Sequence, residues 1–317
     1  MVVTAAVTVV AKEATVAADT NPLAKLTKTP YTGRFCFVCG NFQLMNKDEQ
    51  WLLDEKYGGK KTPSCEDDMQ RLGSGEPLAY VIGYQPFLGL KIYLDSKPLI
   101  PRPETEWWTE GLLRDMSKWS GLPGATRTGD PRTFAKNAQQ LRFLDLCAGS
   151  GTIGCAVLKN VPDGRVYFGE IDSAHKATIL KNIRENNLDD SRAEVRIGDL
   201  FEPFGDMTFD AIAANPPYIP DNRELDKNVH DFEPSLALFA GEDGLDVIRR
   251  ISQELPKHLA KGGVAWIECD SAHAAAACAL FAEQGLKADI RTDQYDAPRI
   301  IVVEHPEPEV ANDRSLL

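Results

Sequence analysis

The stretch that decides the fold reads Phe143-Leu144-Asp145-Leu146-Cys147-Ala148-Gly149-Ser150-Gly151-Thr152-Ile153-Gly154. Its apolar start predicts a buried strand, its small residues predict a tight turn, and residues from 152 to about 159 predict a helix. Glycines let the backbone approach a ligand closely, and a helix start offers free N–H groups. Dinucleotide-binding enzymes use a similar loop, but this one fits the pattern G-x-G-x-x-G poorly.

Acidic residues stand at the ends of this strand and of the next two predicted strands. Asp145 lies in the strand end itself, where a carboxylate would repel a pyrophosphate but can bind a cationic amino-acid ligand. Glu170 follows the second strand, where it is placed to accept from both hydroxyls of a ribose. Asp199 follows the third strand and can accept from an adenine amino group, while the Leu200 amide donates to the ring. Each acid alone is more often an ordinary loop carboxylate. Acids at three successive strand ends, however, match the groups of S-adenosylmethionine and predict a site for it.

The fourth predicted strand, residues 209–214, runs directly into Asn215-Pro216-Pro217-Tyr218. The side-chain oxygen of Asn215 and the backbone carbonyl of Pro216 can each accept one N–H bond from a planar –NH2 group. The two prolines restrict the backbone, so these acceptors are set before the substrate arrives. Tyr218 can stack on a flat substrate. A proline-rich turn is the plainer interpretation, but the position after the glycine loop favours a site for transfer to nitrogen.

Three further segments make the family recognisable. They read Gly75-Glu76-Pro77-Leu78-Ala79-Tyr80-Val81-Ile82-Gly83, Leu99-Ile100-Pro101-Arg102-Pro103-Glu104-Thr105-Glu106 and Phe232-Glu233-Pro234-Ser235-Leu236-Ala237-Leu238-Phe239-Ala240-Gly241-Glu242-Asp243-Gly244-Leu245. With Asn-Pro-Pro-Tyr, they resemble the HemK/PrmC-type methyltransferases over residues 48 to 305. That family methylates the glutamine side chain in the Gly-Gly-Gln loop of class I peptide-chain release factors.

The resemblance implies a site that the residues above already outline. The expected cofactor-binding residues are Asp145, Cys147, Ala148, Gly149, Gly151, Glu170, Ile171, Asp199, Leu200 and Asn215. The expected catalytic residues are Asn215, Pro216, Pro217 and Tyr218, and the expected substrate-binding residues are Phe87, Arg102, Glu104, Asn215, Pro216 and Tyr218. Phe87 would pack over the glutamine stem or else belong to the core. Cys147 departs from the family, which usually has glycine there.

Other functions share parts of this pattern. Adenine-amino methyltransferases of nucleic acids also use Asn-Pro-Pro-Tyr, because an exocyclic amine presents the same donors as an amide; they flip the base and usually add a basic region. A glutamine methyltransferase acting on a ribosomal protein is a closer alternative. A non-catalytic protein that binds adenosylmethionine is the third, and the intact Asn215, Glu170 and Asp199 argue against it. We expect no catalytic histidine, and we assign His230 and His273 to the surface or the core.

Composition and charge limit the kinds of partner and the cellular location that we expect. The chain has 317 residues and a net charge of −12, which disfavours a nucleic acid held by phosphate contacts. No apolar run approaches the ~18 residues of a membrane span, and residues 1–10 make no convincing signal peptide. No arginine precedes Arg34, which argues against a transit peptide. We therefore expect a monomer in a bacterial-type cytoplasm, with a mitochondrial location as the alternative, acting on a protein without direct contact to nucleic acid or membrane.

The seven cysteines are odd in number and scattered, as expected of reduced thiols. Cys36 and Cys39 form a C-x-x-C, but tetrahedral zinc needs four ligands and no second pair follows. Two thiols in a small turn are the preferred interpretation, so no metal is expected.

The predicted fold is α/β: a seven-stranded, doubly wound, Rossmann-like methyltransferase sheet, preceded by a small helical domain and a β-hairpin. The predicted strands are residues 143–146, 165–169, 194–197, 209–214, 264–268, 286–291 and 299–304, and the resemblance implies that the last is antiparallel. The predicted divisions are a loosely attached start (1–30), a helical substrate-recognition domain (31–85), a hairpin linker (86–101), the catalytic domain (102–306) and an acidic tail (307–317). Within them we expect helices over 47–53, over 64–72 with Ser64 as N-cap, and over 104–118, a hairpin over 87–95, and an exposed insertion over 120–137.

Overall fold

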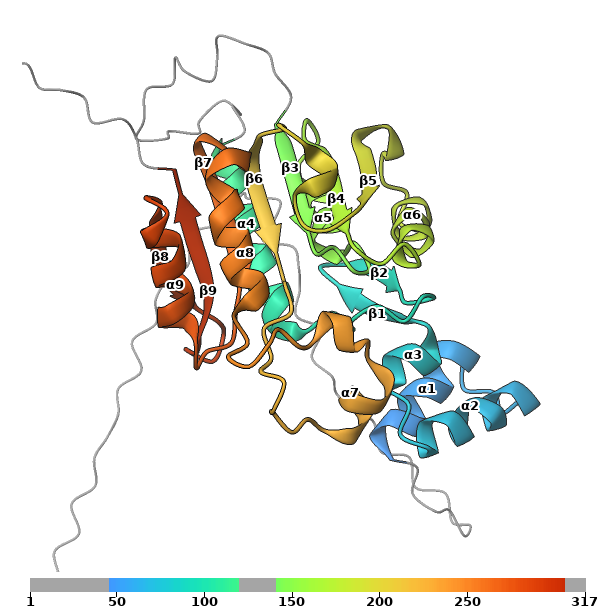
Figure 1. Ribbon diagram of the computed structural model, residues 1–317. Coiled ribbons are helices and arrows are strands. Elements are labelled where there is room, and N and C mark those ends of the chain that lie inside the picture. Colours follow the sequence, from blue (N-terminus) through green and yellow to red (C-terminus); the bar gives the residue numbers. More distant parts are fainter. Residues whose placement is uncertain (1–45, 120–140, 306–317) are drawn as a thin grey trace, which may run out of the picture. The chain divides into compact units, whose positions relative to one another are not determined.

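Seven strands form one sheet in the order β5-β4-β3-β6-β7-β9-β8 (Figure 1). The computed structural model describes residues 46–119 and 141–305. The strands of this sheet are β3 (Arg142–Leu146), β4 (Arg165–Glu170), β5 (Ala193–Ile197), β6 (Phe209–Ala214), β7 (Leu259–Glu268), β8 (Lys287–Thr292) and β9 (Pro298–Glu304). All seven predicted strands are confirmed, and β7 begins five residues earlier than expected.

The strand order places a crevice at the carboxyl ends of β3 and β6. From β3 the chain runs outward through β4 to β5, then returns to the other side of β3 and continues through β6 to β7. These five strands are parallel, and in such sheets ligands bind outside the carboxyl ends where the order reverses. The last strand, β9, pairs antiparallel with both β7 and β8, as the resemblance implied.

Helices precede or connect the strands of this sheet and cover it (Figure 1). They are α4 (Pro103–Trp119), α5 (Thr152–Asn160), α6 (His175–Glu185), α7 (Lys227–Phe232), α8 (Asp246–His258) and α9 (Ala274–Glu283), with 3-10 turns η2 (Asp190–Arg192), η3 (Glu202–Phe204) and η4 (Ser235–Ala237). The buried strands read as nearly continuous apolar runs because each face of the sheet carries its own hydrophobic core. Gly154 of α5 lies against the Phe168 ring of β4, so this helix sits close to the sheet.

The residues before the sheet form α1 (Lys47–Tyr57), α2 (Pro63–Gly73), α3 (Leu78–Ile82) and a hairpin of β1 (Tyr84–Phe87) and β2 (Leu90–Tyr93). Asn46 and Glu49 make a reciprocal capping box at the start of α1. The predicted N-cap of α2, Ser64, was wrong. The N-cap is Thr62, which accepts from the Cys65 amide. The helix starts two residues earlier than predicted because Pro63 suits the first helical position. The hairpin begins three residues earlier than predicted.

Side chains of α6 hold the end of the hairpin. Asn182 accepts from the Tyr93 amide at 2.7 Å and donates to the Tyr93 carbonyl at 3.1 Å. The Ser96 amide donates to Thr178, and the Ser96 hydroxyl lies 2.8 Å from His175 Nδ1. The segment that leads to the Leu99–Glu106 block is therefore fixed against α6.

Several predictions fall outside the described residues. These are the loosely attached start, the Cys36 and Cys39 pair, the insertion over 120–137 and the tail beyond 306. The domain divisions stay predictions. Among the helices that are described, none is both long and apolar enough to cross a membrane.

Candidate active site

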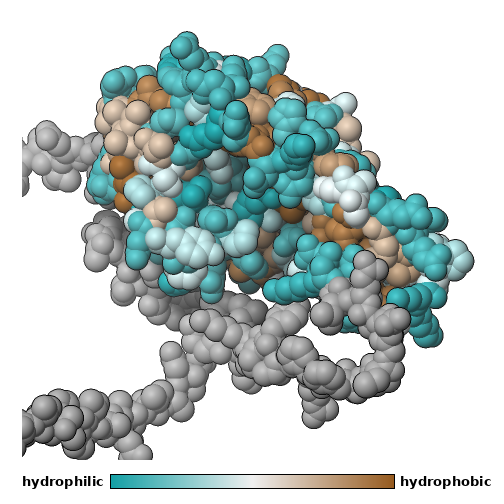
Figure 2. All heavy atoms as spheres, turned by 90° about the horizontal axis from the view of Figure 1, so that it is seen from below, coloured by the Kyte–Doolittle hydropathy of each residue, from teal (hydrophilic) through white to brown (hydrophobic). Residues whose placement is uncertain are grey.

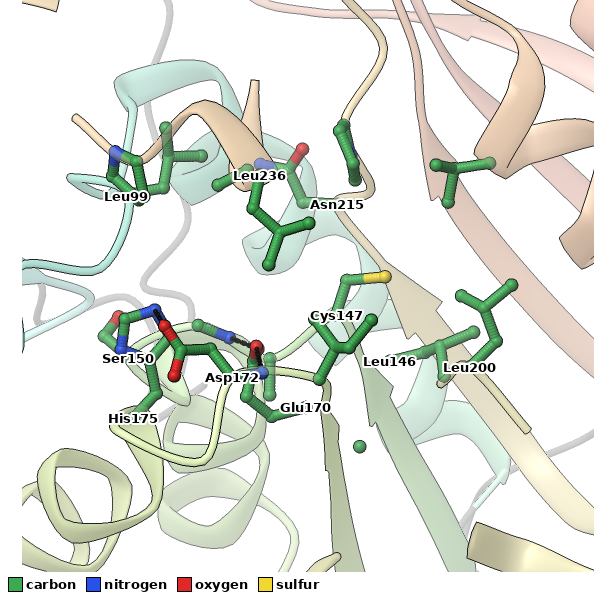
Figure 3. Close-up of a pocket in the computed structure, with 18 of the residues that line it drawn as sticks. Leu99, Leu146, Cys147, Ser150, Glu170, Asp172, His175, Leu200, Asn215 and Leu236 are labelled. Carbon is green, nitrogen blue, oxygen red and sulfur yellow. Dashed lines mark hydrogen bonds and ion pairs between the residues drawn. The ribbon is translucent and has the colours of Figure 1, made fainter. Parts of the chain in front are cut away.

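A cavity opens where the carboxyl ends of β3, β4, β5 and β6 meet. Its wall includes residues from the glycine loop, two of the three predicted acids (Glu170 and Asp199) and part of the Asn-Pro-Pro-Tyr segment. Figure 3 shows Leu99, Leu236 and Asn215 on one side of this cavity and Glu170 and Asp172 on the other. The topology therefore brings the predicted motifs to one place.

The glycine loop turns sharply between β3 and α5. Cys147, Gly149 and Gly151 have φ angles of 60°, 54° and 75°, a region that favours glycine. Cys147 adopts this conformation although it is not glycine. Cys147, Ala148 and Gly149 line the cavity, whereas Gly151 lies behind them and caps α5.

Glu170 ties this loop to the end of β4. One carboxylate oxygen accepts from the Gly149 amide at 2.7 Å, and the other accepts from the Asp172 amide at 2.8 Å. Glu170 is buried and lines the cavity, with Ile171 exposed beside it. Each carboxylate oxygen has a second lone pair, so Glu170 can still accept from a ligand hydroxyl.

Asp145 lies beneath the loop and does not line the cavity. Its Oδ2 accepts from the Gly154 amide at 2.8 Å, while Oδ1 is buried without a partner among the described residues. Burial raises the pKa of Asp145 well above its usual range, and the neighbouring Glu170 charge adds to this. The predicted role of Asp145 in binding a cationic ligand is not supported, because Asp145 is not on the cavity surface; its bond to Gly154 holds the start of α5 beneath the loop.

Asp199 reaches the cavity at the end of β5, with Leu200 beside it. Arg250 of α8 donates to Asp199 Oδ2 at 2.6 Å and also lines the cavity. This ion pair is half-exposed and contributes little to stability, but it orients the carboxylate. Arg250 could not be predicted from the sequence pattern, because it follows Asp199 by some fifty residues.

Asn215 lines the cavity from the end of β6, and its side-chain orientation is set by Thr105. Asn215 Nδ2 donates to Thr105 Oγ1 at 3.1 Å, so the amide oxygen is left to act as an acceptor. Thr105 is itself 3% exposed and sits at the cavity wall. Sequence reasoning chose Arg102 and Glu104 from this block and missed Thr105, the residue that contacts Asn215.

The rest of the tetrapeptide is placed less simply. Pro217 lines the cavity, whereas Pro216 is buried behind it. Tyr218 does not line the cavity; its hydroxyl donates to the Glu268 carboxylate at 2.9 Å. The Tyr218 ring is therefore not in a position to stack on a substrate in this cavity, as had been expected. The role of the Pro216 carbonyl stays a prediction.

Three predicted substrate contacts lie elsewhere. Phe87 is 1% exposed and belongs to the core, because β1 turns it inward against the sheet. Arg102 pairs with Glu233 at 2.5 Å and does not line the cavity. Glu104 at the start of α4 does not line it either. None of the three residues is on the surface of the cavity.

Apolar residues surround the cavity near Asn215. They include Leu99, Pro101, Pro234, Leu236 and Phe239. Leu236, on the short turn η4, is 56% exposed although it is apolar. Of the histidines, His175 lines the cavity and His230 and His273 do not. Within residues 46–119 and 141–305, no cluster of metal-binding side chains is found.

The chain is similar in sequence to known methyltransferases. Residues 132–232 match the family model "Methyltransferase small domain". The release factor glutamine methyltransferase of Chlamydia trachomatis serovar L2 is 30% identical over 75% of this chain and 75% of its own. That of Streptococcus pneumoniae is 32% identical over 75% of this chain and 78% of its own.

Among solved structures, a methyltransferase from Pyrococcus furiosus has a TM-score of 0.46 and 15% identity, covering 75% of this chain and 98% of that one. So distant a likeness adds nothing to the sequence relationship. The sequence relatives are enough: the chain belongs to the release factor glutamine methyltransferase family.

Proposed function

We propose that this protein transfers a methyl group from S-adenosylmethionine to the side-chain amide nitrogen of the glutamine in the Gly-Gly-Gln loop of class I release factors. The observation that carries the proposal is Asn215, held by Thr105 at the wall of the cavity that the glycine loop forms. The relatives named above carry the release factor in their names, so this candidate is preferred to a ribosomal protein.

The cofactor is S-adenosylmethionine, and the cavity wall fits it. Glu170 and Asp199 supply acceptors at neighbouring strand ends for ribose hydroxyls and an adenine amino group. The positive φ angles of Cys147 and Gly149 bend the backbone so that the loop can follow a ligand closely. When bound, this cofactor supplies an electrophilic methyl group on a sulfonium sulfur.

The chemical difficulty lies in the substrate nitrogen. A primary amide is a poor nucleophile because its lone pair is delocalised into the carbonyl. Asn215 Oδ1, and the Pro216 carbonyl as proposed from the sequence, accept the two N–H bonds and stabilise the positive charge that develops on nitrogen. Alignment of two reactants contributes a further ~7–11 kcal/mol in favourable cases. No strong base has to act first, because the proton can leave after the methyl group has been transferred.

The apolar residues near Asn215 suit the approach of a Gly-Gly-Gln loop. Two glycines have no side chains to obstruct the entrance, and the glutamine stem is made of methylene groups. Leu99 and Leu236 provide an apolar wall for that stem. This part of the site takes over the role that the sequence had assigned to Phe87.

The proposed partner is a folded protein bound by a single copy of this chain. The net charge of −12 disfavours a direct role for nucleic acid. The face seen in Figure 2 is mostly hydrophilic, with small hydrophobic patches among polar residues. We place the reaction in the cytoplasm, where the bacterial substrate acts, with the mitochondrion as the alternative.

Mass spectrometry tests the proposal. Candidate release factors and ribosomal proteins are incubated with the protein and labelled adenosylmethionine, and the modified residue is located after digestion. The proposal expects label on the Gly-Gly-Gln glutamine. Label on a ribosomal protein alone, with the release factor unmodified, overturns it.

A further inference from the structure

Glu268 ends β7 beside the Asn-Pro-Pro-Tyr segment and is 1% exposed. Its carboxylate accepts three hydrogen bonds. Thr105 Oγ1 donates to Oε2 at 2.7 Å, Trp108 Nε1 donates to Oε2 at 2.6 Å, and the Tyr218 hydroxyl donates to Oε1 at 2.9 Å. Glu268 does not line the cavity, and nothing in the transfer described above uses it.

The direction of these bonds fixes the neighbouring amide. A threonine hydroxyl has one hydrogen, and Thr105 gives it to Glu268. Toward Asn215 the same oxygen can then only accept, so the Asn215 –NH2 group has to face Thr105. Without the Glu268 acceptor, the Thr105 hydrogen could turn to Asn215, and the amide could flip. A flipped Asn215 would present its own –NH2 group, which is only a donor, to the –NH2 group of the substrate.

We infer that Glu268 is a positioning residue that acts through Thr105 to hold the Asn215 oxygen ready for the substrate nitrogen. The inference rests on the proposed function, and it concerns how that site is prepared. The bond from Tyr218 ties the far end of the same tetrapeptide to the same carboxylate. Asn215, through Thr105, and Tyr218, directly, are thus both linked by hydrogen bonds to the buried Glu268 carboxylate.

A carboxylate is suited to this place because it only accepts hydrogen bonds. Burial raises the pKa of Glu268, while the three donors and Arg299 act in the opposite direction. Glutamine would bring an –NH2 group that has to face at least one of these donors. A buried donor left without an acceptor is unfavourable, so the arrangement would change.

The test uses Thr105→Val, which has nearly the same shape but no hydroxyl, and Thr105→Ser, which keeps it. We expect kcat for release-factor methylation to fall about 10–100-fold in Thr105→Val, with cofactor Kd within a few-fold of the wild type. Thr105→Ser should restore most of the lost rate. In Asn215→Ala, adding Thr105→Val should change the residual rate little, because the two act as a unit. An unchanged kcat in folded Thr105→Val overturns the inference, as does a purely multiplicative loss in the double variant.

A second measurement does not depend on the substrate. The 1H–15N signals of the Asn215 side-chain amide are assigned by their loss in Asn215→Ala. Thr105→Val and Glu268→Gln should shift them and speed exchange with solvent, and identical signals in wild type and both variants would reject the relay. If wild-type protein leaves the release factor unmethylated, the proposed function fails, and these signals still decide the orientation of Asn215.

Discussion

Glu170 connects cofactor binding to the shape of the glycine loop at the level of a single side chain. The carboxylate that is proposed to accept from the ribose also accepts from the Gly149 and Asp172 amides. Two backbone segments that must curve around a ligand are therefore held by the group that contacts it. Removing this carboxylate affects both the contact and the support.

Glu170→Ala is predicted to raise the Kd of S-adenosylmethionine about 10-fold or more, since at least ~1–2 kcal/mol of hydrogen bonding is lost. Isothermal titration measures the change. Glu185→Ala, at the end of α6 and away from the cavity, is the matched control and should bind normally. A titration of Glu170→Ala that superimposes on the wild type removes this residue from the ribose site.

Asn215→Ala is predicted to reduce methyl transfer by at least about 100-fold, as removal of one preorganised polar group at a reacting centre commonly does. Cofactor Kd should stay within a few-fold, because Asn215 acts on the substrate nitrogen. Transfer of labelled methyl groups and cofactor titration measure the two effects separately. If cofactor affinity collapses in parallel with the rate, the role given to Asn215 is wrong.

At the scale of elements, the site depends on how closely α5 lies on the sheet. A Cβ atom built on Gly154 would be 2.2 Å from Phe168 Cε1, so only glycine lets the helix approach β4 this far. The Gly154 amide also donates to Asp145, which anchors the start of the helix beneath the loop. The position of the glycine loop thus follows from one helix–strand contact.

Gly154→Ala is predicted to destabilise the fold by about 1–3 kcal/mol, because an added methyl group overpacks this contact. The clash outweighs the helix-propensity gain of alanine, which is at most about 1 kcal/mol. Thermal unfolding should show a lower Tm, partly restored by adding Phe168→Leu. Gly73→Ala at the end of α2, where an added Cβ meets nothing within 4 Å, is the control and should not lower Tm. An unshifted Tm for Gly154→Ala would contradict the packing described here.

The sequence pattern predicted the strands and helices well, but it did not predict which side chains from different elements contact one another. The buried strands could be predicted because apolar runs such as 209–214 have few other uses. Thr105 and Glu268 could not be assigned, because Thr105 meets Asn215 and Glu268 only after α4, β6 and β7 come together. The one available sign was an acid closing an apolar strand at Glu268, like the acids that close β4 and follow β5. The role of Phe87 could not be decided from the sequence, because an aromatic residue in a hairpin is compatible with either a core or a binding role; the structure places it in the core.

At the scale of the whole molecule, an acid-sensitive link joins the first helices to the segment leading into the site. Glu76 accepts two bonds from Arg71 at 2.9 Å and one from Lys97 at 3.0 Å. Its side chain is only 8% exposed. These partners, Arg71 foremost, lower the pKa of Glu76 below its ordinary value of 4.5. A lowered pKa in the folded state gives stability that is present above the ordinary value and is lost as pH falls through the folded value.

Glu76→Gln is therefore predicted to lower Tm at neutral pH and to flatten the loss of stability as pH falls below about 4.5. Tm measured across acidic and neutral pH checks both effects. Glu66→Gln, an exposed position on α2, is the control and should follow the wild-type curve. A Glu76→Gln curve parallel to that of the wild type at all pH values would show that this link has no part in acid sensitivity.

The most direct measurement of the central claim is a crystal structure of the protein with S-adenosylhomocysteine and a release factor or a peptide carrying its Gly-Gly-Gln loop. We predict the glutamine nitrogen within hydrogen-bonding distance of Asn215 Oδ1 and the Pro216 carbonyl, with the bond from Asn215 to Thr105 intact. A glutamine amide that binds elsewhere, or an Asn215 oxygen turned toward Thr105, would contradict the account.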